Sequence, residues 1–310
     1  MYTLGNILFA VVLLEVSRTV ISMCAAGVLL IAIGFWVAKN DVVRERGLDK
    51  VVALTNMFFA MPLAVFGAEH FAAAKGIMEL VPKFMPWHLF WTYFVGLALI
   101  AASLSIATKI GARWSGLMFG IMMFLFVAMM DLPATIQNLH DRIIWALFFR
   151  ELSFGSGGWV LAGTAMRGSR AAGGNRLITV GRIIIGVAAM FYGVEHFLHP
   201  FNVPGVPLEK LMPVWIPARK LISYFTGALL LAGGACILQG KKARTAATYL
   251  GSWIVLLVLC IYGPILIASL LDPSTATKVE GINYFADTLL YGGTILTLAA
   301  DKSGMVNPVA

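Results

Sequence analysis

Charged residues are scarce in this chain of 310 residues. Only 12% of the residues are Asp, Glu, Lys or Arg, and 60% are hydrophobic, whereas about a quarter of a soluble domain is charged. Apolar runs of about 20 residues recur, each long enough to cross about 30 Å of hydrocarbon as a helix. The alternating polar and apolar residues of an outer-membrane barrel are absent. The composition therefore predicts an all-α transmembrane protein.

Several chemical signatures are also missing. The three cysteines lie singly in apolar runs without a CxxC spacing, which indicates neither a disulfide framework nor an iron-sulfur site. No Walker sequence, nucleophile elbow or HExxH motif occurs. Because no basic residue precedes Arg18, we expect no secretory signal peptide, and residues 4–14 are too short to span. They are expected to form an interfacial helix or to extend the first span.

The net charge of +8 does not indicate a nucleic-acid partner, because the basic residues lie in short loops between apolar runs. The lipid bilayer is the expected partner instead. Fourteen Lys and Arg residues fall on one predicted side of the membrane and eight on the other. The side with fourteen is expected to be cytoplasmic, which places the N-terminus outside and the C-terminus inside.

About nine spans are predicted, one N-terminal span followed by two blocks of four. The runs cover residues 19–38, 51–73, 88–107, 114–131, 143–165, 177–198, 219–238, 245–270 and 282–300. A Gly/Arg-rich connector at residues 167–176 separates the two blocks. The predicted units are therefore residues 1–50, a first half at 51–168 and a second half at 177–302.

The two halves match each other in sequence. Five features of the first half recur in the second at one constant offset, 213 − 82 = 131: Pro82 and Pro213, Pro86 and Pro217, Tyr93-x-x-Gly96 and Tyr224-x-x-Gly227, Ala112-Arg113 and Ala243-Arg244, and Pro133 and Pro264. Ahead of these prolines the offset is 195 − 69 = 126, so the second half has five extra residues there. Four spans per repeat predicts two parallel repeats related by an axis along the membrane normal.

A Glu-His pair ends the first span of each half, as Glu69-His70 and Glu195-His196. An ionisable pair in an apolar run is costly, so its repetition marks a candidate polar site. Candidate members from the fourth spans are Arg150, Glu151 and Asp287. Arg150 has a bland alternative role as the counter-ion of Asp131 or Glu69, and the Glu-His pairs as structural ties between helix ends.

The loops after the Glu-His pairs carry proline and tryptophan. They are predicted either to anchor at the headgroup layer or to form a lid over the Glu-His site. The residues concerned are Pro82, Pro86, Trp87, Pro213, Trp215 and Pro217. His196 and His199 share a helical face but lack the further ligands that zinc needs, so no metal site is predicted and these two are only weak candidates. Haem between His70 and His196 is disfavoured as well.

The order Gly-x-Glu-His-Phe, Pro-x-x-x-Pro loop, Tyr-x-x-Gly span and basic Ala-Arg turn resembles the DoxX-like family of four-span bacterial membrane proteins, here in tandem. The resemblance implies a place in the bacterial cytoplasmic (inner) membrane and redox-associated work, with respiratory or other redox membrane subunits as partners and a quinone as the cofactor. Cysteines at the outer face, which thiol chemistry would favour, are absent from this chain.

Three functions remain open at this point. The first is an accessory of a quinone-linked redox system with an outward-facing Glu/His site. The second is a proton-coupled transporter of small molecules, for which parallel repeats and intramembrane carboxylates are suited. The third is a non-catalytic membrane scaffold or binding protein, in which the polar pairs are structural. The sequence does not decide whether the chain is an enzyme.

Overall fold

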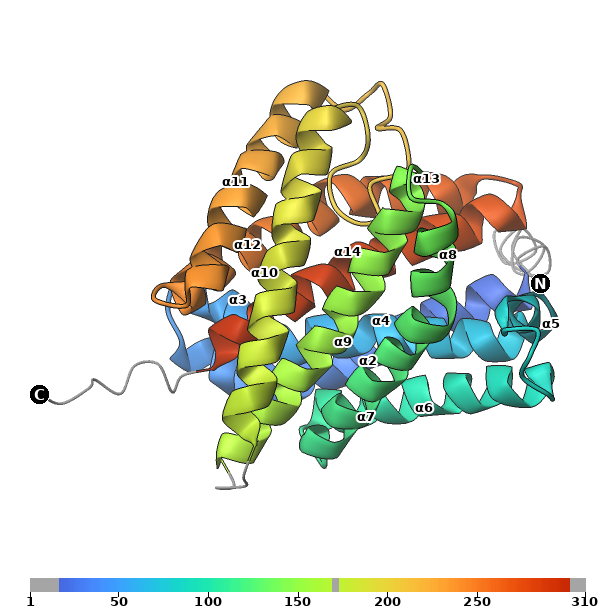
Figure 1. Ribbon diagram of the computed structural model, residues 1–310, viewed down its shortest axis with the longest axis horizontal. Coiled ribbons are helices and arrows are strands. Elements are labelled where there is room, and N and C mark those ends of the chain that lie inside the picture. The colour runs from blue at the N-terminus through green and yellow to red at the C-terminus, as the bar shows by residue number, and fades with distance from the viewer. Residues whose placement is uncertain (1–16, 169–172, 302–310) are drawn as a thin grey trace, which may run out of the picture.

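The computed structural model describes residues 17–168 and 173–301 (Figure 1). All regular elements in this part of the chain are helices, and one isolated β-bridge joins Asn202 to Leu211. The helices are α2 (Arg18–Arg44), α3 (Asp49–Ala53), α4 (Thr55–Ala72), α5 (Ala74–Ile77), η1 (Met78–Leu80), α6 (His88–Thr108), α7 (Ala112–Phe126), η2 (Val127–Asp131), α8 (Leu132–Gln137), α9 (Arg142–Gly168), α10 (Gly174–Leu198), α11 (Arg219–Gln239), α12 (Ala243–Leu257), η3 (Val258–Tyr262), α13 (Gly263–Leu271) and α14 (Thr275–Ala300). The predicted helix at residues 4–14 and the middle of the predicted connector lie outside the described residues.

Six helical segments of the described chain are long and apolar enough to cross a membrane, which identifies a multi-pass helical membrane protein. They are α2, α6, α7 with α8, α10, α11, and α12 with α13. A seventh candidate, α4 with α5 and η1, is bent by 92° after Ala72. The count differs from the predicted nine because α9 and α14, although 27 and 26 residues long, carry ionisable residues along their length.

Helix α14 is the centre of the bundle. Every residue from Ala286 to Ala299 is buried, and the helix packs against α4, α9 and α12. It crosses the middle of the molecule in Figure 1. A helix buried on all sides needs apolar residues around its whole circumference. The polar side chains that α14 nevertheless carries therefore lie in the protein interior, away from lipid.

Two π-helical turns, η2 and η3, interrupt helices that otherwise continue from α7 into α8 and from α12 into α13. Each is followed two residues later by a proline, Pro133 or Pro264. Proline lacks an N–H and clashes with the carbonyl four residues back, and a widened turn accommodates both defects. The wide turns end at Asp131 and Tyr262, which places these two side chains at equivalent points of the two halves.

Both Glu-His pairs lie in the last turn of their helices, as predicted. The Ala73 N–H donates to the Glu69 carbonyl at 2.7 Å where α4 ends. The His199 N–H donates to the Glu195 carbonyl at 2.8 Å where α10 ends. The chain leaves the helix within four residues of each glutamate, so the ionisable pairs lie at the ends of the apolar runs.

The helix connections fall on two opposite sides of the molecule. In Figure 1, α3 and the turns α9–α10 and α11–α12 lie toward the lower left. Helices α5, α8 and α13 and the loop from α10 to α11 lie toward the upper right. Successive connections thus alternate between the two sides, which is the arrangement that a chain crossing a membrane repeatedly requires.

Glycines in α9 and α14 make the close helix contacts predicted for them. A Cβ on Gly158 would lie 2.7 Å from the Gly116 carbonyl oxygen of α7. A Cβ on Gly293 would lie 2.9 Å from the Phe59 backbone nitrogen of α4. Backbone atoms cannot move aside as a flexible side chain can, so only glycine permits these distances.

We predict that Gly293→Ala destabilises the protein, because the new methyl group must push α14 away from the α4 backbone. Overpacking of this kind costs about 1–3 kcal/mol. Thermal unfolding in detergent should show a lowered Tm. The control is Gly76→Ala, whose Cβ would meet nothing within 4 Å and should leave Tm unchanged. Equal melting of the two variants would contradict the close contact.

Candidate functional site

Arg150 on α9 connects two carboxylates in the bundle interior. Its Nη1 donates to Asp287 Oδ2 on α14 at 2.8 Å, and its Nη2 donates to Glu151 Oε1 at 2.7 Å. The side chains of Arg150, Glu151 and Asp287 are 19%, 18% and 11% exposed. The structure therefore brings all three fourth-span candidates together. The partners of Arg150 are Glu151 and Asp287, whereas the sequence had offered Asp131 and Glu69.

Two further carboxylates lie close to this cluster. Asp131, at the end of the π-turn η2, is near enough for its charge to interact with Glu151 and Arg150. Glu69 interacts in the same way with Asp287. Four carboxylates thus surround one guanidinium. A low-dielectric interior does not tolerate such uncompensated charge, so bound protons or a cation must offset it.

Helix α14 carries a stripe of polar side chains along one face. Asn283, Asp287, Tyr291 and Thr294 follow one another at intervals of four, four and three residues, which is the spacing of one helical face. At the outer end Asn283 Nδ2 donates to Glu69 Oε1 at 3.1 Å. The stripe therefore leads from the first Glu-His pair, past the Arg150 cluster, into the middle of the bundle.

The inner part of this stripe contains buried polar atoms without a protein partner. The Asn283 Oδ1, the Tyr291 hydroxyl and the Thr294 Oγ1 have no protein hydrogen-bond partner in the described chain. The Tyr291 ring packs against Tyr192 with centroids 5.5 Å apart. Nearly all buried polar groups in proteins are hydrogen-bonded. An aligned series of unpartnered groups is therefore a feature of function, because packing alone would have selected apolar side chains.

The second Glu-His pair has different partners from the first. Arg142 Nη1, from the start of α9, lies 3.3 Å from Glu195 Oε2 and also donates to the Leu208 carbonyl at 3.2 Å. His199 Nε2 lies 3.7 Å from the same glutamate oxygen. Glu195 thus pairs with α9 of the first half, and Glu69 pairs with α14 of the second half. Each predicted pair faces the opposite half of the chain.

His196 is committed to structure. Its ring is fully buried, Nδ1 pairs with the Tyr192 carbonyl at 2.6 Å, and Nε2 accepts from the Gly205 N–H at 3.2 Å. Both nitrogens are occupied, which leaves no lone pair for a metal or a haem iron. His70 Nδ1 likewise pairs with the Phe66 carbonyl of its own helix, at 2.7 Å. In the described residues no three His, Cys, Asp or Glu side chains are placed to hold a metal ion.

A buried loop segment closes the outer end of the second half. Residues 202–208, here named the plug, are all buried although they belong to the loop between α10 and α11. Thr288 Oγ1 donates to the Val206 carbonyl at 3.1 Å, and Asn202 Nδ2 donates to the Leu208 carbonyl at 2.7 Å. Because Thr288 follows Asp287 directly, the plug lies against the outer side of the carboxylate cluster.

The residues predicted as a lid lie elsewhere. Trp87 and Trp215 are 77% and 54% exposed, which suits anchoring in the headgroup layer. Pro82 and Pro213 are half-buried, and Pro86 and Pro217 are exposed. The lid prediction was therefore wrong in its residues, because the plug covers the second half and these side chains do not. The five extra residues of the second half were the sequence signal for the plug.

Sequence reasoning also missed the tyrosines of the interior. Tyr192 donates its hydroxyl to the Ala146 carbonyl at 2.5 Å, and Tyr262 lies near enough to Asp287 for their charges to interact. Tyr262 occupies the position equivalent to Asp131, since 262 − 131 = 131. The spacing of the α14 stripe was present in the sequence and could have indicated Tyr291.

Comparison with protein-family models, with curated proteins and with solved structures finds no match to this chain. The fold and the site define a class, namely a multi-pass helical membrane protein with a buried cluster of ionisable residues. The resemblance to DoxX-like proteins, and the quinone and redox partners that it implies, stay predictions from the sequence motifs.

We predict that Arg150→Met strongly destabilises the protein, since it leaves Glu151 and Asp287 without their buried cation. Breaking a buried ion pair from one side costs about 3–5 kcal/mol. The triple variant Arg150→Met/Glu151→Gln/Asp287→Asn, which removes all three charges, should recover most of that loss. Thermal unfolding in detergent measures both. If the single and triple variants melt together, the cluster is not held by its charges.

Proposed function

We propose that the protein is a proton-coupled carrier of small solutes, built from two parallel four-span repeats behind one N-terminal span. The repeat is supported by local features that recur at the same offset. Trp87 and Ala218 both precede a span in the left-handed conformation, with φ of 55° and 51°, and 218 − 87 = 131. Phe71 stacks on Tyr93 and Phe197 stacks on Tyr224, each at 5.6 Å between ring centroids.

Nine spans follow if α4, α9 and α14 also cross the bilayer. A span with ionisable residues is costly only where those residues meet lipid. The Arg150 cluster faces the bundle interior, and α14 is enclosed by other helices. Interior placement of the charges therefore supports α9 and α14 as spans that are shielded by their neighbours.

The proposed orientation is that of the bacterial cytoplasmic membrane, with the lower-left side of Figure 1 inside. Lys39, Lys50, Lys109 and Lys241 belong to connections on that side. An excess of Lys and Arg marks cytoplasmic loops. The Glu-His pairs and the plug then belong to the outer side, and the polar stripe of α14 runs from there toward the inside.

One observation supports proton coupling most directly, the excess of carboxylates over cations at the interface of the two halves. Glu69, Asp131, Glu151 and Asp287 share a single close cation, Arg150. Protons are the smallest charges that can restore neutrality there. The side chains line up from Glu69 through Asn283 and Asp287 to Tyr291, which supports a path for those protons.

The plug supports alternating access. It closes the outer end of the second half with hydrogen bonds to Thr288, next to Asp287, and to Arg142, the partner of Glu195. These bonds reach α14 and α9, the two helices of the Arg150 cluster. A change of protonation in the cluster therefore acts on helices that hold the plug. Carriers use such coupling to open one side at a time.

We predict that Asp287→Asn and Glu151→Gln each abolish coupled proton movement. Purified protein in liposomes with an internal pH dye is given a panel of amino acids, organic acids and amines, and solute-dependent acidification or alkalinisation is recorded. Loss of a proton-transferring group lowers rates by about 10²–10⁴-fold. The control Glu79→Gln removes an exposed carboxylate of the outer loop and should retain the wild-type rate.

Two results would contradict the proposal. One is solute-dependent proton flux in the Asp287→Asn and Glu151→Gln proteins at the wild-type rate. The other is wild-type protein without any flux across the whole panel, with variants that change only Tm. The second result assigns the cluster to the stability of a non-catalytic scaffold.

A further inference from the structure

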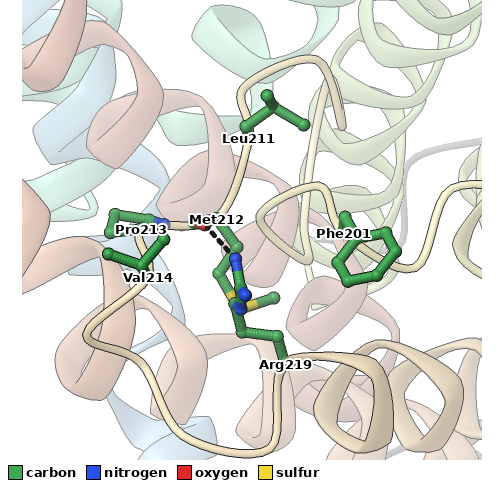
Figure 2. Close-up of a pocket in the computed structure, with 6 residues that line it drawn as sticks. All are labelled: Phe201, Leu211, Met212, Pro213, Val214 and Arg219. Atoms are coloured by element: carbon green, nitrogen blue, oxygen red, sulfur yellow. Dashed lines mark hydrogen bonds between the residues drawn. The ribbon is translucent and has the colours of Figure 1, made fainter.

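A cavity of about 450 Å³ opens beside the plug, where the loop returns to α11 (Figure 2). Its lining residues are Phe201, Leu211, Met212, Pro213, Val214 and Arg219. The loop joins the ends of two candidate spans, Leu198 of α10 and Arg219 of α11. Lining residues within a few positions of both span ends lie at the level where hydrocarbon gives way to headgroups.

The cavity has an exposed apolar lining. Leu211 is 70% exposed, Val214 is 85% exposed and Phe201 is 44% exposed. Side chains of this kind gain free energy by inserting into the boundary between headgroups and acyl chains. The lining is therefore suited to contact with the glycerol region and first methylenes of a lipid.

Two cations stand at the same cavity. The Arg219 guanidinium lies 5.7 Å and the Lys220 ammonium 4.9 Å from the centre of the Phe201 ring. Arg219 Nη1 donates to the Met212 carbonyl at 3.3 Å, as Figure 2 shows, which fixes the side chain and leaves its other N–H groups available. In the described chain neither cation is paired with a carboxylate. The cavity is thus positively charged.

The N-terminus of α11 adds to this charge. Arg219 is the first residue of this 21-residue helix, and no side chain caps the helix start. The free N–H groups of a first turn carry partial positive charge and favour an anion. In the first half the equivalent positions, 219 − 131 = 88 and 220 − 131 = 89, hold His88 and Leu89. The paired cations therefore occur in the second half alone.

We propose that this cavity binds one anionic phospholipid of the outer leaflet. The phosphate lies against Arg219, Lys220 and the start of α11, and the glycerol and upper acyl chain lie against Phe201, Leu211 and Val214. Ligand cavities usually measure about 300–1,000 Å³, which includes this one. The proposal does not depend on proton transport, because it concerns the outer loop and none of the carboxylates.

The test is native mass spectrometry of the full-length protein with added phosphatidylglycerol or phosphatidylcholine. We expect phosphatidylglycerol to bind more tightly. The variant Arg219→Gln/Lys220→Met should lower that affinity by about tenfold or more, since charge-assisted hydrogen bonds are the strong ones. Lys220→Met alone, which removes a side chain without a printed hydrogen bond in this loop, should give part of the loss and guards against misfolding of the double variant.

The matched control is Lys75→Met/Lys83→Met, which removes two exposed cations from the outer loop of the first half and should keep wild-type affinity. Equal binding of the anionic and the neutral lipid would overturn the proposal. So would an equal loss of affinity in the control, which would assign binding to general surface charge. Displacement of the lipid by soluble glycerol phosphate would overturn it too, because a free phosphate would then be the ligand.

Discussion

Arg150 holds Asp287 and Glu151 inside the bundle, and the rest of the architecture follows from the need to keep these charges away from lipid. The 2.8 Å contact between Arg150 and Asp287 joins α9 of the first half to α14 of the second. It persists only if both helices are enclosed. Glycines at the contacts of α9 with α7 and of α14 with α4 bring the backbones close enough to exclude lipid. A buried ion pair contributes little net stability by itself, but removing one partner is costly. The pair therefore fixes how the halves meet.

The two halves share their plan and differ at the outer side. In the first half the Glu69 carboxylate accepts from Asn283 and the following loop is exposed. In the second half the His196 ring is sealed by Gly205, and the plug occupies the equivalent place. One ancestral-like arrangement of Glu, His and proline loop thus serves two roles, an open approach beside Glu69 and a closed one beside Glu195. This difference gives the carboxylate cluster an asymmetric route to the outer side.

Helices and helix ends were predictable from the sequence, because long apolar runs and their ionisable ends are local features. The Glu-His positions and the close-packed glycines of α9 and α14 agree with the prediction. The partners of Arg150 were not predictable, since they depend on how two helices 137 residues apart rotate against each other. The plug was hidden for a related reason. Five extra residues show that a loop is longer, but its burial depends on the space between α9, α10 and α14.

The central claim is that the excess carboxylates around Arg150 hold a proton in the resting protein. Infrared spectroscopy of the purified protein near neutral pH tests it, because a protonated buried carboxyl group has a carbonyl stretch separate from that of carboxylates. We expect this band in the wild type and its loss or shift in Asp131→Asn or Asp287→Asn, with Glu79→Gln unchanged. A wild-type spectrum with every carboxyl group ionised would contradict the claim.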